Sequence, residues 1–158
     1  MVMVGVLLDR EPDTIGEWLA DASAFDASGA DALWVDCGPR PDWDVLALAA
    51  ALAVVTHRAR LMVTLHDTPQ GMDRTVDTIG RLSRGRLLLM GDASDAGAGE
   101  LWESVPVPQG RESWRAICAD AAERGVSGLV VPADPRLLDI LRNPDDPGER
   151  HDLQLAQG

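Results

Sequence analysis

Short apolar runs alternate with stretches of helical periodicity along most of the chain. Continuous apolar, β-branched runs predict buried strands over residues 2–8, 32–35, 60–65, 86–90, 101–107 and 128–131. Apolar side chains at helical spacing predict helices over residues 14–28, 43–55, 69–82, 111–125 and 135–142. We expect the helices to be capped or opened by the residues that precede them, namely Asp13, Asp42, Thr68 with Pro69, and Asp134 with Pro135.

This regular alternation predicts an α/β fold with a parallel sheet. A complete eight-stranded barrel needs about 250 residues, whereas this chain has 158. We therefore expect an incomplete TIM-type (β/α) barrel with about six parallel strands. It should occupy residues 1–142, and the polar, proline-rich residues 143–158 should form a C-terminal tail.

The helix predicted around residues 45–55 consists only of Val, Leu and Ala. A helix that is apolar on every side must be covered on every side. Two explanations remain open, because the cover could come from a second subunit or from loops of the same chain. We favour a homodimer through the helices at residues 45–55 and 69–82.

The charge balance excludes several kinds of partner. The chain carries 14 Arg, no Lys and 26 acidic residues, which gives a formal net charge of −12. Binding to nucleic acid or to an anionic membrane needs clustered cations, so neither is expected. The longest apolar run is shorter than the roughly 20 residues that span a bilayer. The N-terminal residues lack the basic segment of a signal peptide, and the two cysteines form no CxxC pair, so we expect a cytoplasmic protein.

An acidic residue follows nearly every predicted strand, and the set is Asp9, Asp36, Asp67, Asp92 and Asp134. The carboxyl ends of parallel strands meet at one mouth, so these carboxylates and His66 could surround a ligand. They could hold Mg²⁺ or Mn²⁺. The favoured explanation is that Asp residues cap the helices that follow, and we predict no metal site. His66 is either a site residue or a solvated loop histidine.

Three segments carry a resemblance to a known family. They are GADALWVD at residues 29–36, LALAAALAVVTHRARLMV at residues 46–63 and TVDTIGRLSRGRLLLMGD at residues 75–92. Their order and spacing resemble the luciferase-like flavin-dependent monooxygenases, the bacterial luciferase superfamily. The resemblance covers about the first 92 residues. Residues 111–142 are weakly similar to the last units of that family's barrel.

The resemblance implies a flavin-dependent oxidoreductase that uses FMN or a deazaflavin at the carboxyl-terminal mouth and acts on a small organic molecule. It also implies a dimer through the second and third helices. His66 is our candidate catalytic residue because it lies at the end of the third predicted strand, where a site residue would be. The cofactor would contact Asp9, Asp36, Gly91 and Asp92, with Arg111 as its phosphate partner.

Two departures from the family pattern keep a second function open. About two central strand–helix units are missing after Met90, and Asp92 places a carboxylate where the anionic flavin would lie. The alternative is a degenerate, non-catalytic member that binds a ligand or a partner protein. We expect flavin binding by the isolated chain to be weak or absent.

Overall fold

The computed structural model describes residues 1–9, 14–39, 42–66, 71–91 and 99–144. The strands are β1 (Met3–Leu7), β2 (Ala32–Val35), β3 (Arg60–Thr64), β4 (Leu87–Met90), β5 (Trp102–Ser104) and β6 (Gly128–Pro132). The helices are α1 (Ile15–Ala27), α2 (Val45–Val55), α3 (Asp73–Leu82), α4 (Arg111–Glu123) and α5 (Pro135–Arg142). Within this described part of the chain, no helix has the length and apolar character needed to cross a membrane.

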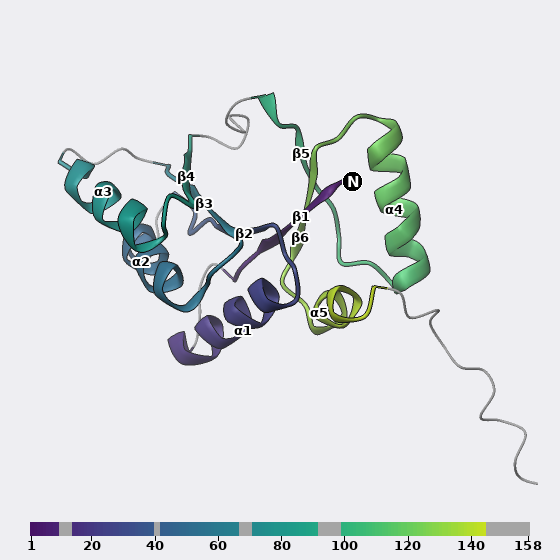
Figure 1. The fold of residues 1–158 in the computed structure, drawn as a ribbon, viewed down its shortest axis with the longest axis horizontal. Helices are drawn as coiled ribbons and strands as arrows, with labels where there is room; N and C mark the ends of the chain where they lie inside the picture. The colour runs from purple at the N-terminus through teal and green to yellow at the C-terminus, as the bar shows by residue number, and fades with distance from the viewer. Residues whose placement is uncertain (10–13, 40–41, 67–70, 92–98, 145–158) are drawn as a thin grey trace, which may run out of the picture.

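All six strands are parallel and follow the order β4-β3-β2-β1-β6-β5. The first strand therefore lies beside the last, as in a closed barrel, but β4 and β5 do not pair. The sheet curls, and the helices lie along its outer side from α3 round to α4 (Figure 1). The predicted incomplete TIM-type barrel is confirmed.

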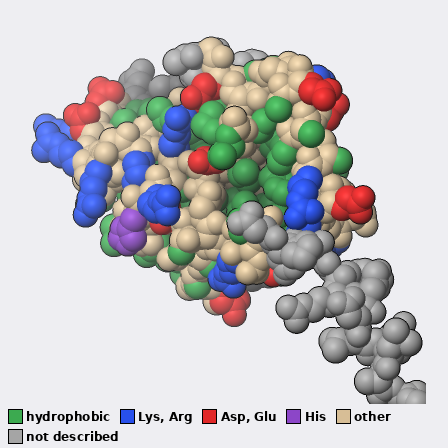
Figure 2. All heavy atoms as spheres, turned by 45° about the vertical axis from the view of Figure 1, so that its right-hand side comes forward, with side chains coloured by type: hydrophobic (Ala, Val, Ile, Leu, Met, Phe, Trp, Pro, Cys, Tyr) green, Lys and Arg blue, Asp and Glu red, His purple; other side chains and the backbone are tan. Residues whose placement is uncertain are grey.

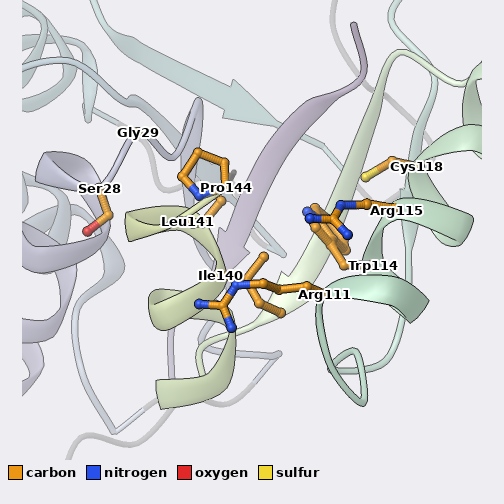
Figure 3. Close-up of a pocket in the computed structure, with 9 residues that line it drawn as sticks. All are labelled: Ser28, Gly29, Arg111, Trp114, Arg115, Cys118, Ile140, Leu141 and Pro144. Atoms are coloured by element: carbon orange, nitrogen blue, oxygen red, sulfur yellow. The ribbon is translucent and has the colours of Figure 1, made fainter. Parts of the chain in front are cut away.

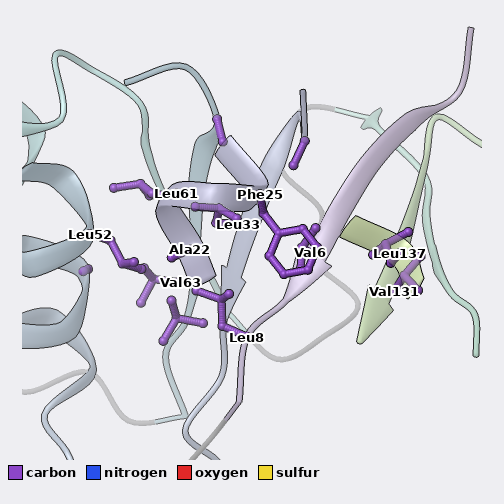
Figure 4. Close-up of a cluster of buried hydrophobic side chains, with 14 of the residues drawn as sticks. Val6, Leu8, Ala22, Phe25, Leu33, Leu52, Leu61, Val63, Val131 and Leu137 are labelled. Carbon is purple, nitrogen blue, oxygen red and sulfur yellow. The ribbon is translucent and has the colours of Figure 1, made fainter. Parts of the chain in front are cut away.

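The main core lies between the outer face of the sheet and the helices. Alternate strand residues point outward and are almost fully buried, among them Val6, Leu33, Leu61 and Val131. Helix residues such as Leu52 pack against them in one continuous cluster (Figure 4). In a parallel sheet covered by helices, this burial is what the near-continuous apolar strands predict.

The inner face of the curled sheet is filled by aromatic side chains. The rings of Trp34 and Trp102 meet edge to face, with their centroids 5.8 Å apart, and both pack on Ala32, Met62 and Met90. Two glycines make room for Trp102. A Cβ at Gly5 would lie 3.0 Å from its ring, and a Cβ at Gly128 would overlap the ring. The interior is thus packed with side chains, as in complete barrels.

An ion pair adjoins this aromatic cluster. Arg60, the first residue of β3, donates from Nη1 to both carboxylate oxygens of Glu100, at 3.0 and 2.9 Å. The indole of Trp102 also donates to Glu100, at 3.2 Å. These bonds hold the segment before β5 against the amino end of β3. They link the two sides of the opening across which β4 and β5 do not pair.

Several predicted boundaries were wrong. Asp44, not Asp42, caps α2, and its carboxylate accepts hydrogen bonds from the backbone N–H groups of Leu46 and Ala47 at 2.8 and 3.0 Å. Helix α3 begins at Asp73 rather than near residue 69, because Gly71 has a φ of +83°, which no right-handed helix contains. Strand β5 is short because Pro106 and Pro108 have no N–H to donate to a neighbour.

Other expected caps and the tail lie partly outside the described residues. Thr14 is the N-cap residue of α1, and the expected cap Asp13 is outside the described part of the chain, as are Thr68 and Pro69. Asp134 caps α5 as predicted. Of the predicted tail, the structure describes Asn143 and Pro144 only.

Candidate functional site

The carboxyl-terminal mouth of the sheet contains one side-chain pair of chemical interest, Asp36 with His66. Nε2 of His66 lies 2.8 Å from Oδ1 of Asp36, and the backbone N–H of Gly38 donates to the same oxygen at 2.8 Å. An ionised carboxylate only accepts, so Nε2 is the donor. In a neutral imidazole, Nδ1 is then left as an acceptor. The pair is partly exposed, with 27% of the His66 side chain and 17% of the Asp36 side chain accessible.

The strand geometry explains why these two residues meet. Asp36 is two positions after Trp34, and His66 is two positions after Thr64, so each pair points to the same face of the sheet. The indole N–H of Trp34 donates to the hydroxyl of Thr64 at 3.0 Å. This inner bond fixes the ends of β2 and β3 side by side directly below the pair.

The other acidic residues that were predicted for the mouth and that the structure describes, Asp9 and Asp134, do not join this pair in a metal site. Asp9 is exposed after β1, and its backbone carbonyl accepts a hydrogen bond from the Trp18 indole at 3.1 Å. Gly91 is exposed at the end of β4, and Asp67 and Asp92 lie outside the described residues. Asp134 is used as a helix cap. Among the residues described, no group of three or more His, Cys, Asp and Glu side chains could hold a metal ion.

Arg111, the predicted phosphate partner, makes its contacts with α5 rather than with the Asp36–His66 pair. Its Nη2 donates to Oδ2 of Asp139 at 2.7 Å, and its Nε donates to the backbone carbonyl of Asn143 at 3.2 Å. Only 17% of the Arg111 side chain is accessible. Figure 3 shows this side chain extending from α4 toward α5.

A pocket of about 410 Å³ lies beside this contact, between α4, α5 and the turn after α1. Its lining includes the α4 residues Arg111, Trp114, Arg115 and Cys118 (Figure 3). These positions are spaced i, i+3, i+4 and i+7, so they share one face of the helix. This pocket was not predicted from the sequence, although the spacing of the two arginines and the tryptophan places them on one helix face.

The described side chains do not fit a bound reduced flavin. FMN carries a phosphate as well as the charge of its reduced ring, and such a polyanion needs cationic partners. Among the residues that the structure describes, the mouth offers the carboxylates of Asp9 and Asp36, together with an imidazole that is already bonded to Asp36. The guanidinium of Arg111 is paired with Asp139 instead. Carboxylates near an anion in a partly desolvated site repel it.

No protein-family model matches the chain, and a search of the curated proteins finds no match either. The resemblance to the luciferase-like proteins therefore stays a prediction from the sequence.

Proposed function

We propose that this chain is a non-catalytic binding module, a degenerate relative of the luciferase-like flavoproteins that takes a small molecule without using a flavin. The observation that carries this proposal is the pairing of Arg111 with Asp139 in the helical layer. The side chain expected to anchor a flavin phosphate contacts α5 instead of the mouth, while the described groups at the mouth are acidic or already paired. A cofactor that loses a charge-assisted phosphate contact loses much of its affinity.

A flavin titration tests this proposal. The purified full chain is mixed with FMN, and binding is followed by quenching of flavin fluorescence, with the same measurement on the chemically reduced cofactor. We expect no saturable binding at micromolar concentrations. A micromolar complex that is weakened by substituting His66→Ala at the mouth would overturn the proposal.

A second candidate is the flavin-dependent oxidoreductase that the resemblance implies, acting on a small organic substrate with FMN or a deazaflavin. The Asp36–His66 pair favours it, because a carboxylate that fixes an imidazole tautomer is a common arrangement for proton transfer. In this alternative His66 would hold or move a proton through Nδ1, and Asp36 would orient it. The flavin would supply the redox chemistry when bound. The titration above separates the two candidates, since only this one requires a complex at the mouth.

We also propose that two copies associate through α2 and α3. In the single chain, α2 buries Leu48 and Leu52 within the fold, but Val54 is 62% exposed. Ala47 lies seven residues before Val54, on the same face of α2, and it is exposed as well. Leu82, at the end of the neighbouring α3, is 46% exposed. The loops that the structure describes do not cover these exposed side chains. A second copy of the chain would cover them.

We also propose that the protein is cytoplasmic. Neither Cys37 nor Cys118, the two cysteines of the chain, forms a disulfide in the structure. Disulfides are rare in a reducing compartment such as the cytoplasm.

A further inference from the structure

The pocket between α4, α5 and the turn after α1 combines an apolar wall with cationic side chains. Trp114 and Ile140 are 9% and 4% exposed, and they form part of both the pocket and the main core. Cys118 adds a thiol whose pKa is raised by burial, so it stays neutral and acts as part of the apolar wall. Pockets that bind small molecules have this mainly apolar lining, with a few polar groups that fix the orientation of the ligand.

Three of the chain's arginines gather at this pocket. Arg111 and Arg115 line it, and Arg142 donates from Nε to the hydroxyl of the lining residue Ser28 at 3.4 Å. The chain as a whole has a net charge of −12. A local cluster of arginines therefore favours an anion here more than the rest of this acidic chain does. Figure 2 shows hydrophobic side chains gathered on the face that carries α4, with charged side chains around them.

The pairing of Arg111 leaves donor capacity for a ligand. Its bonds to Asp139 and Asn143 use Nη2 and Nε, and Nη1 takes part in neither. The partner carboxylate of Asp139 is 58% exposed, so part of it faces water. A ligand carboxylate could bond to Nη1, or it could replace the Asp139 carboxylate in a geometry that guanidinium groups favour.

We propose that this pocket binds a small carboxylate with an apolar body, such as an aromatic acid. The carboxylate would lie against the guanidinium groups of Arg111 and Arg115, and the apolar body would pack on Trp114 and Ile140. The volume of about 410 Å³ is at the small end of the range for ligand pockets, which suits one or two rings. This inference rests on the proposed function, because it names the ligand class of the binding module.

Isothermal titration calorimetry with the full chain tests the proposal, with 2-naphthoate as the probe. We expect saturable binding that is about tenfold or more tighter than that of the uncharged 2-naphthamide, since a hydrogen bond to a charged group contributes that much. Acetate, which has the charge without the rings, should bind at least tenfold more weakly. Equal binding of naphthoate and naphthamide would overturn the role of the arginines.

Three variants locate the site. Arg115→Gln should weaken naphthoate binding about tenfold. Asp139→Asn should strengthen it several-fold, because it removes the competing charge yet keeps an oxygen for the Asn143 amide. Arg81→Gln, on the exposed surface of α3, removes the same charge elsewhere and is the matched control. Equal losses in Arg115→Gln and Arg81→Gln, or no gain in Asp139→Asn, would refute the site.

Measurements of flavin and naphthoate binding distinguish a failure of this proposal from a failure of the proposed function. A flavin bound at the mouth would be weakened by His66→Ala and unaffected by Arg115→Gln, and it would refute the non-flavin function whatever naphthoate does. Failure of naphthoate to bind, with no flavin bound either, would refute only the assignment of this pocket.

Discussion

Replacing Asp26 by Asn should destabilise the fold strongly, because this buried carboxylate holds a whole turn. Asp26, near the end of α1, is 4% exposed. Its two oxygens accept hydrogen bonds from the backbone N–H groups of His57, Arg58 and Ala59 at 2.8, 2.9 and 2.6 Å. These groups lie in the turn between α2 and β3, and they donate to the Asp26 carboxylate.

The cost of Asp26→Asn follows from these three bonds. The amide oxygen of Asn can still accept two of them, but its nitrogen would face the N–H of His57, so that a donor meets a donor. One bond to a charged group is lost, at about 1.5–3 kcal/mol, and the other two weaken to bonds with a neutral acceptor. The negative charge that faces Arg86 also disappears. We expect a loss of about 3 kcal/mol in the free energy of unfolding at neutral pH.

The loss should depend on pH in a defined direction. Burial by itself would raise the pKa of Asp26, but the N–H groups at positions 57–59 and the charge of Arg86 outweigh it and lower the pKa below 3.8. A carboxyl whose pKa is lower in the folded state stabilises the fold above its unfolded pKa and loses that effect as the pH falls through the folded value. The difference between wild type and variant should therefore shrink below about pH 4.

Urea unfolding followed by tryptophan fluorescence measures the effect. At a slope of about 2 kcal/mol per molar, a loss of 3 kcal/mol moves the midpoint down by about 1.5 M. Asp21→Asn is the matched control, because Asp21 is exposed on the same helix. Equal midpoints for the two variants at neutral pH would refute the reasoning, and so would a difference that grows in acid.

Two further pairs of variants, each with its own control, test the barrel interior and the proposed dimer. Gly128→Ala should lower the free energy of unfolding by about 1–3 kcal/mol in thermal or urea unfolding, because the new methyl group overlaps the Trp102 ring. The control is Gly80→Ala in α3, where the space around the new methyl group is open. That variant should raise the free energy of unfolding by up to about 1 kcal/mol. Val54→Glu should convert the proposed dimer to a monomer in a sedimentation experiment. The control Ala116→Glu, on the exposed side of α4, should leave the dimer intact. A wild-type chain that sediments as a monomer would refute the dimer.

Much of the fold could be predicted because the pattern of apolar residues along the strands and helices indicates which side chains are buried. Strands such as β3 and β6 are covered on the outer face by helices and on the inner face by other side chains, so they appear as continuous apolar runs. Boundaries were less predictable where several capping residues lie close together. Asp42 and Asp44 are both good caps by residue type, and only the structure shows that Asp44 accepts hydrogen bonds from the N–H groups of Leu46 and Ala47.

The candidate site was predictable only in part. The topology of parallel strands brings Asp36 and His66 to one mouth, and this follows from their positions after β2 and β3. The partner of Arg111 could not be predicted in the same way. It depends on how α4 and α5 lie against each other, and the sequence separation of 28 residues between Arg111 and Asp139 gives no sign of it.

The residues that carry the family resemblance bear on the fold more than on a cofactor. Asp31, from the first segment, accepts a hydrogen bond from the Val4 N–H at 2.8 Å and so joins the starts of β1 and β2. Arg86, from the third, donates to the hydroxyl and carbonyl of Thr56, from the second, at 3.1 and 2.8 Å. It also donates to the carbonyl of Ala59 at 2.7 Å.

All these contacts lie at the amino ends of the strands, where residues of a barrel stabilise the fold, and away from the mouth, where ligands bind. The three segments could therefore persist in a chain that has kept the curled sheet and lost the flavin. Similarity confined to them supports a shared architecture, and evidence about chemistry has to come from the mouth and from the arginine-lined pocket.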